Sequence, residues 1–469
     1  MIHLNEKLTP ADLLPKLDKF WHRSAECLDA IEATFPQGTA TSPQGSATPV
    51  FTVEGQYTAQ GWTEWTQGFQ YGSLLLQFDA TDEQRFFELG RQRTVDSMAS
   101  HLTHVGVHDH GFNNVSTYGN LWRLMNEGRV PEDEWQRNFC ELALKVTGAV
   151  QASRWAVTSD GTGYIYSFNG PQSLFVDTIR SCRALAISYQ LGHALMGEQD
   201  LKISLLECLI EHSVNTARYN IWYGEGRDTY DIRGRTAHES IFNTAASGEY
   251  RCPSSQQGYS PFSTWTRGLA WAMLGFPEQL EWLATLPDEE FEVCGGRESV
   301  EALFLKAALA TCDFYIEQTP TCGVPYWDTG APGLAKLGDY LDRPAEPFNA
   351  FEPVDSSAAA IAAQGLLRLG QVLDVRGETA SGARYRQAGL TVLDTLLDEP
   401  YLSTDSGHQG LLLHSIYHRP NGWDHIPAGQ TIPCGESSMW GDYHARELAL
   451  YVGRLAKEKP YYTFFGPNQ

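Results

Sequence analysis

The sequence lacks both an excess of positive charge and any long apolar run. Its 469 residues include 34 Lys and Arg against 57 Asp and Glu, which gives a formal net charge of -23. Because nucleic acids and anionic membranes bind basic surfaces, we expect neither as a partner. No stretch is apolar enough to predict a membrane-spanning helix, and residues 1–17 lack the apolar core of a secretory signal.

Cysteine is scarce and shows no pattern. The nine Cys, an odd number, are scattered along the chain without CxxC pairs. Free thiols in a reducing compartment explain them better than a disulfide framework, so the composition favours a soluble cytoplasmic protein. The GxSxG, P-loop and GxGxxG motifs are also missing, which removes support for a hydrolase elbow, an NTPase or a dinucleotide-binding fold. We expect no cofactor.

Helical periodicity is what the sequence does contain, and it predicts about twelve helices. They are expected near residues 10–33, 62–80, 81–103, 115–128, 131–153, 173–197, 198–218, 263–275, 299–317, 354–371, 378–396 and 436–456. Long loops rich in Gly, Pro and aromatic residues precede every second helix, at 34–61, 104–114, 154–172, 219–262, 318–353 and 397–435.

This alternation of long and short connections makes successive helices run up and down, with the long loops at one end. It predicts an all-α fold in which residues 1–469 form a single (α/α)6 barrel of six helical hairpins, with the long loops on one rim. An open solenoid is the alternative. It is less favoured because no repeat of about 34 or 40 residues is present and the loops are long for a solenoid.

The segment 251–276 changes from an irregular loop to a helix at Ser263, the expected N-cap. Arg267 and Trp271 are four residues apart and share one helix face, with Trp265 in the first turn. This pattern indicates an aromatic wall beside a cation. It is equally consistent with Trp side chains in the core and an Arg in a structural ion pair.

Other polar residues fall in the long loops or in the first turns that follow them. Two of them are carboxylates, Asp109 within His108-Asp109-His110 and Asp177 at the start of the sixth helix. Carboxylates among Trp, His and Arg suit acid/base chemistry on a sugar-like ligand. First-turn acids can also serve only the helix dipole. The spacing of His108 and His110 matches no strong metal motif, and we expect no metal.

Several segments together resemble the unsaturated glucuronyl hydrolases of glycoside hydrolase family 88, and the resemblance spans most of the chain. These segments are 65–69 (WTQGF), 108–112 (HDHGF), 176–178 (VDT), 251–259 (RCPSSQQGY), 263–271 (STWTRGLAW), 355–360 (DSSAAA) and 440–443 (WGDY). The block from Gln257 to Trp271 is the most specific of them.

The resemblance implies an (α/α)6 barrel, in agreement with the loop pattern. It implies a hydrolase that removes the terminal 4,5-unsaturated uronic acid from lyase-generated oligosaccharides by hydrating the C4=C5 enol ether. Asp177 resembles the acid that protonates C4 and then activates water. Asp109 resembles a second essential acid that keeps Asp177 partly protonated by repulsion. The expected partner is an unsaturated uronyl di- or oligosaccharide, and the expected binding residues are Trp65, His108, His238, Gln257, Trp265, Arg267 and Trp271.

Two departures from the family pattern stand out. Arg180 follows Asp177 by three residues and would lower its pKa if it pointed inward. Residues 434–439 (CGESSM) lack the Lys of the Ser-x-x-Ser-x-Lys pattern of sulfate-selective members, so a preference for 6-sulfated disaccharides is not predicted. The alternatives are a conventional acid/base glycosidase using Asp109 and Asp177, a sugar epimerase on the same barrel, and a non-catalytic sugar-binding protein. The sequence does not indicate the oligomeric state.

Overall fold

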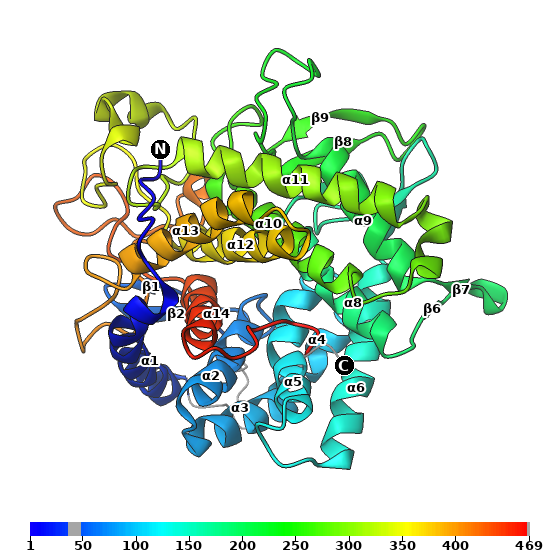
Figure 1. The fold of residues 1–469 in the computed structure, drawn as a ribbon, viewed down its shortest axis with the longest axis horizontal. Helices are drawn as coiled ribbons and strands as arrows, with labels where there is room; N and C mark the ends of the chain where they lie inside the picture. The colour runs from blue at the N-terminus through cyan, green and yellow to red at the C-terminus, as the bar shows by residue number, and fades with distance from the viewer. Residues whose placement is uncertain (36–47, 467–469) are drawn as a thin grey trace.

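The computed structural model describes residues 1–35 and 48–466, and it is built mainly of helices (Figure 1). Six helical segments form an inner ring in which each packs against the next and the last packs against the first. They are α2 (Gln67–Thr81), the π-helix η2 (Gly111–Gly119) continued by α5 (Asn120–Asn126), α7 (Thr178–Ser181) with α8 (Arg183–Gln190), α10 (Thr266–Leu283), α12 (Ser356–Val375) and α14 (Met439–Ala456). They are buried along most of their length because other helices cover them.

The outer layer consists of the helices that alternate with these in sequence. They are α1 (Leu14–Thr34), α3 (Gln84–Ser97) with α4 (Ala99–Leu102), α6 (Glu134–Ala152), α9 (Leu205–Tyr219), α11 (Arg297–Gln318) and α13 (Thr379–Leu396). Each buries one apolar stripe and exposes the other face, as amphipathic helices do. Helices α1 and α14, from the two ends of the chain, lie side by side (Figure 1). The predicted (α/α)6 barrel is confirmed.

Short antiparallel strands occupy the long loops. They are β1 (Thr48–Val53) with β2 (Gln56–Gln60), β3 (Trp155–Val157) with β4 (Gly163–Ile165), and a sheet in the order β5 (Ser173–Phe175), β8 (Glu239–Phe242), β9 (Tyr250–Ser254). A further pair, β6 (Leu195–Met196) and β7 (Lys202–Ile203), connects α8 to α9. Single bridges such as Phe51 to Ser438 and Trp265 to Asp328 join one long loop to another, so these loops form a continuous rim.

Several predicted boundaries were wrong. The sixth helix does not run from 173 to 197, because residues 173–175 pair with β8 and the helix ends at Gln190. Ser263 is not an N-cap: Trp265 remains extended and bridges to Asp328, so α10 begins at Thr266. Helix α10 also continues past its predicted end to Leu283, with Pro277 inside it.

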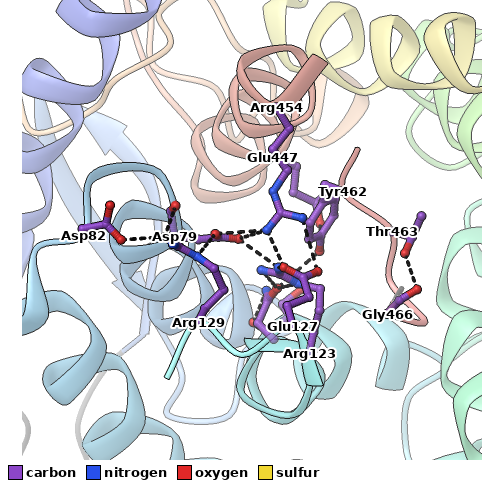
Figure 2. Close-up of polar contacts among 12 residues, drawn as sticks. Asp79, Asp82, Arg123, Glu127, Arg129, Glu447, Arg454, Tyr462, Thr463 and Gly466 are labelled. Atoms are coloured by element: carbon purple, nitrogen blue, oxygen red, sulfur yellow. Dashed lines mark hydrogen bonds and ion pairs between the residues drawn. The ribbon is translucent and has the colours of Figure 1, made fainter. Parts of the chain in front are cut away.

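Buried ion pairs close the end of the barrel opposite the long loops (Figure 2). Arg454, in the last turn of α14, contacts Asp79 at 2.8 Å and Glu127 at 2.6 Å, and Arg123 contacts Asp79 at 2.9 Å. The hydroxyl of Tyr462 in the C-terminal segment is 3.1 Å from Glu447. Arg side chains near helix C-termini also interact favourably with the helix dipoles. Ion pairs and helix dipoles together therefore stabilise this end of the barrel.

Candidate functional site

A cavity of roughly 620 Å³ lies at the rim formed by the long loops. Eight of the nine predicted site residues line it: Trp65, His108, Asp109, Asp177, Gln257, Trp265, Arg267 and Trp271. They come from four separate long loops and the helices that follow them, and the barrel closure brings them together. The ninth, His238, lies directly behind this lining, with its ring 4.7 Å from that of Trp265.

A second cavity, of about 740 Å³, lies at the opposite end beside the ion pairs of Asp79 and Arg454. It is the larger of the two, but its buried acids are already paired: Asp79 contacts Arg123, Arg129 and Arg454. The rim cavity instead contains carboxylates with no Lys or Arg partner among the described residues. We therefore place the functional site at the rim.

The two predicted acids meet at one imidazole. His108 Nε2 lies 3.6 Å from Asp109 Oδ1 and 3.5 Å from Asp177 Oδ1, and Asp109 and Asp177 are only 9% and 8% exposed. Asp177 occupies the N-cap position of α7, yet its side chain makes no capping hydrogen bond. The carboxylate is therefore directed to His108 rather than used to begin the helix.

A close backbone contact holds these acids together. Gly111, two residues after Asp109, donates its N–H to Ser181 Oγ at 2.8 Å, and Ser181 follows Asp177 by four residues. A Cβ atom at Gly111 would overlap the backbone of Ser181. On the other side of η2, Gly68 donates its N–H to Asn113 Oδ1 at 2.8 Å and would also clash if it had a side chain. Both glycines lie in the motifs that carry the family resemblance.

The pKa values of Asp109 and His108 are raised, whereas the pKa of Asp177 is lowered. Burial, with the neighbouring charge of Asp177, raises the pKa of Asp109 although His108 opposes the shift. Burial would raise the pKa of Asp177 too, but the close contact and charge of His108 outweigh it and leave the pKa lowered. Burial would lower the pKa of His108, but the two carboxylates raise it.

These directions correct one expectation. We expected repulsion from Asp109 to raise the pKa of Asp177 and keep it partly protonated. In the structure the pKa is raised at Asp109 and lowered at Asp177. The reason is that at Asp177 the charges of His108, His238 and Arg267 outweigh burial, whereas at Asp109 burial and the charge of Asp177 outweigh His108.

His238 has one free nitrogen beside the cavity. Its Nδ1 accepts the backbone N–H groups of Gln256 at 3.1 Å and Gln257 at 3.3 Å, which leaves the proton on Nε2. Nε2 is buried without a partner among the described residues. Burial lowers the pKa of His238 to about 4, so the ring is neutral at pH 7 and can donate one hydrogen bond.

Arg267 is held on several sides. It pairs with Asp355 at 2.8 Å, donates to Gln257 Oε1 at 2.8 Å and to the carbonyl of Tyr417 at 2.7 Å, and also contacts the carbonyl of Ile416. Its guanidinium carbon is 4.6 Å from the ring centre of Trp265. The sequence left open whether Arg267 was a structural ion pair or part of an aromatic wall, and both descriptions apply.

Arg180 points away from the cavity. It pairs with Glu447 at 2.7 Å and with Glu278, both buried inside the barrel. It is absent from the main influences on the pKa of Asp177, which are burial and the charges of His108, His238 and Arg267. His110 also faces elsewhere, with Nδ1 2.7 Å from Thr147 Oγ1. His108 and His110 therefore do not converge on one point.

Sequence reasoning missed several residues that line the cavity. Glu64, Phe168, Tyr417 and Trp423 all contribute to it, and Phe168 and Trp423 are 57% and 51% exposed at its edge. Glu64 could have been noticed because it directly precedes the Trp65 motif. The others lie in long loops whose path the sequence does not predict.

Paired carboxylates in an aromatic cavity at the rim of a helical barrel are the arrangement of an enzyme that acts on sugars. A scan against models of known protein families found no match. Among curated proteins, the chain is 26% identical to an unsaturated glucuronyl hydrolase of Bacillus sp. (strain GL1) over 408 residues, 85% of this chain and 89% of the relative.

Two further relatives are also named as hydrolases of unsaturated sugars. An unsaturated glucuronyl hydrolase of Formosa agariphila is 23% identical, covering 82% of this chain and 78% of the relative. An unsaturated chondroitin disaccharide hydrolase of Streptococcus pyogenes serotype M1 is also 23% identical, covering 85% and 84%. The predicted resemblance to the unsaturated glucuronyl hydrolases is confirmed.

Solved structures support the fold. The crystal structure of unsaturated glucuronyl hydrolase from Bacillus sp. GL1 matches with a TM-score of 0.68 at 21% identity, covering 93% of this chain and 97% of that one. The enzyme from Streptococcus agalactiae gives 0.68 at 19% identity, covering 98% of both.

Proposed function

We propose that this protein is a hydrolase that removes the terminal 4,5-unsaturated uronic acid from lyase-generated oligosaccharides by hydrating the C4=C5 bond. The observation that carries the proposal is the pair of buried acids that share His108 on the floor of an aromatic cavity. Relatives that cover most of the chain bear the name of this activity. The substrate is an unsaturated uronyl di- or oligosaccharide.

The reaction needs one proton donor and one activated water. Protonation of C4 by Asp177 makes C5 electron-poor, and water then adds at C5 while the same carboxylate takes a water proton. The product is a hemiketal at C5. When its bond to the ring oxygen breaks, C5 becomes a ketone and C1 a hemiacetal, which expels the second sugar as an alcohol and becomes an aldehyde.

Asp177 must gain a proton before it can act as the acid, and substrate binding favours this. Asp177 has a lowered pKa and starts the reaction as a carboxylate. A uronate carboxylate entering the cavity adds negative charge and displaces water, and both effects raise the pKa values of nearby acids. The pKa values of Asp109 and His108 are both raised, so these two neighbours are the groups from which a proton can pass to Asp177.

Neutral groups complete the binding surface. His238 Nε2 is an unpartnered donor behind Trp265, and Gln257 is held by Arg267. Trp65 and Trp271 provide apolar faces for a sugar ring. In this proposal, all seven predicted binding residues contact the unsaturated uronyl sugar or hold a residue that does.

Residues 1–469 act as one catalytic domain in this proposal, since a single main hydrophobic core includes residues from Ile2 to Phe465. We place the protein in the cytoplasm. The support is its nine free cysteines, all within the described residues. No helix among the described residues is long and apolar enough to cross a membrane.

A matched pair of substrates tests the proposal. The enzyme should abolish the ultraviolet absorbance of an unsaturated uronyl disaccharide and leave its saturated counterpart intact, because only the first has a double bond to hydrate. Cleavage of the saturated disaccharide at a comparable rate would indicate a conventional glycosidase instead. Binding of both without turnover would indicate a sugar-binding protein.

A further inference from the structure

Glu64 is a third acid in the rim cavity, and the proposed reaction does not use it. It lines the cavity together with Asp109 and Tyr417 and is half-buried there. Its Oε1 accepts the backbone N–H of Trp65 at 3.0 Å. Burial and the charge of Asp109 raise its pKa. These contacts place a carboxylate in the wall of the cavity, one residue from a predicted sugar-binding Trp.

No cation compensates this carboxylate. Within residues 1–35 and 48–466, Glu64 forms no ion pair with any Lys, Arg or His. Arg267 is the one Lys or Arg that lines the cavity among the described residues, and its charge is already paired with Asp355. His418, which also lines the cavity, has its pKa lowered to about 4 by burial and is neutral at pH 7.

Arg154, a cation behind the lining, is also occupied. Arg154 influences the pKa of Asp109, but its guanidinium donates to the carbonyls of Tyr166 at 3.1 Å and Ser167 at 2.7 Å and also to that of Val105. It is 6% exposed and does not line the cavity. His108 also lines the cavity, but it already lies between Asp109 and Asp177, so the carboxylate of Glu64 has no cation of its own among the described residues.

The edge of the cavity is apolar rather than charged. Phe168 and Trp423 are about half exposed there, and the ring of Trp423 is 5.2 Å from that of Tyr417. Exposed aromatic faces pack against the C–H faces of pyranose rings and make no use of ionic substituents. Glu64 is near this edge, because burial and the charge of Glu64 raise the pKa of Tyr417, the neighbour of Trp423. An uncharged sugar fits the edge, whereas a sulfate or a second carboxylate would meet Glu64 without a counter-ion.

We infer that Glu64 is a specificity-determining residue that restricts the second sugar of the substrate to one without sulfate or carboxylate groups. The inference rests on the proposed function, because it concerns the sugar that the reaction releases. Repulsion between two charges several ångströms apart in a partly buried site is large enough to reduce kcat/KM by roughly tenfold or more. It acts on binding, so the effect should appear mainly in KM.

Matched unsaturated disaccharides test this inference. We would measure kcat/KM for unsulfated and 6-sulfated forms in both the 1→3 series from chondroitin and the 1→4 series from N-acetylated heparin. The wild-type protein should prefer the unsulfated form by about tenfold or more in whichever series it cleaves. Glu64→Gln should narrow this ratio by about fivefold or more, mainly through KM for the sulfated form.

Two controls separate charge exclusion from other causes. Glu292→Gln, which removes an exposed acid that does not line the cavity, should leave the ratio unchanged. For the wild type, raising the salt concentration should narrow the ratio because it screens the repulsion, and this holds even if Glu64→Gln does not fold. A ratio near one in the wild type, or a ratio that Glu64→Gln and salt leave unchanged, would overturn the inference. Absence of turnover with every disaccharide would instead count against the proposed function.

Discussion

At the scale of single residues, the site depends on how buried charges are paired. Arg267 and Asp355 form a buried ion pair, and each also makes a further hydrogen bond. Arg267 donates to Gln257, and Asp355 caps α12 by accepting the N–H of Ser357 at 3.1 Å. Removing one member of such a pair leaves an uncompensated charge in the interior, which costs far more than the pair contributes. Arg267 thus connects the stability of the barrel to the shape of the cavity.

Replacing Arg267 by Met tests this connection. The free energy of unfolding should fall by about 3–5 kcal/mol, because Asp355 remains buried without a counter-ion. Denaturant unfolding measures the loss. The double variant Arg267→Met/Asp355→Asn should lose less than the sum of the two single variants. Strict additivity would contradict the ion-pair interpretation.

The sequence predicted which residues gather at the site, but not which partners they have. Spacing placed Arg267 and Trp271 on one helix face, and motifs identified Asp109 and Asp177. Nothing in the sequence indicated that the carbonyls of residues 416 and 417, some 150 positions away, would share the guanidinium. Those contacts arise only when the barrel closes. The sequence therefore could not decide whether Arg267 forms a structural ion pair or is the cation beside an aromatic wall.

At the scale of elements, the distance between the two acids is set where η2 packs on α7. Gly111 brings the two backbones together, and its N–H bond to Ser181 fixes their register. π-Helices of this length are rare and often occur at functional sites. The contact lies two residues from Asp109 and four from Asp177, so a small displacement there moves one acid relative to the other.

Gly111→Ala should therefore impair turnover more than folding. The added Cβ overlaps the Ser181 backbone, so η2 and α7 must separate. A displacement of about 1 Å is expected to lower kcat by about a hundredfold. Gly106→Ala is the control, since its Cβ would meet only the His104 side chain, 3.1 Å away, in the same loop. Equal kcat values for the two variants would show that this contact does not position the acids.

Helix order was predictable because apolar spacing repeats over several turns, and all twelve predicted helical segments are present. The rim strands were not predictable. Strands of three residues, such as Ser173–Phe175, contain too few positions to show alternation, and their pairing with β8 spans more than sixty residues. That pairing also explains why the sixth helix begins later than its apolar pattern indicated.

At the scale of the whole molecule, buried histidines dominate the expected response to acid. Burial lowers the pKa of seven of them to between about 3 and about 4: His101, His110, His212, His238, His414, His418 and His444. Each is neutral in the folded protein but takes up a proton below pH 6.5 when the chain unfolds. The stability present above pH 6.5 is therefore lost as the pH falls toward 4.

Unfolding measured between pH 7.5 and pH 4.5 checks this. Each histidine contributes at most about 1.4 kcal/mol per pH unit, so the combined slope should reach several kcal/mol per unit near pH 5.5. Asp328 and Asp424, whose pKa values burial raises to about 6, offset part of it. Constant stability from pH 7 to pH 5 would contradict the prediction.

The most direct test of the account measures turnover and binding together in Asp177→Asn, with an unsaturated uronyl disaccharide as the substrate. The account predicts that kcat falls by at least about a thousandfold, because the variant cannot donate or accept the proton, while calorimetry shows the disaccharide still bound. Asp109→Asn should also lose most of its turnover. Wild-type kcat in Asp177→Asn would contradict the account.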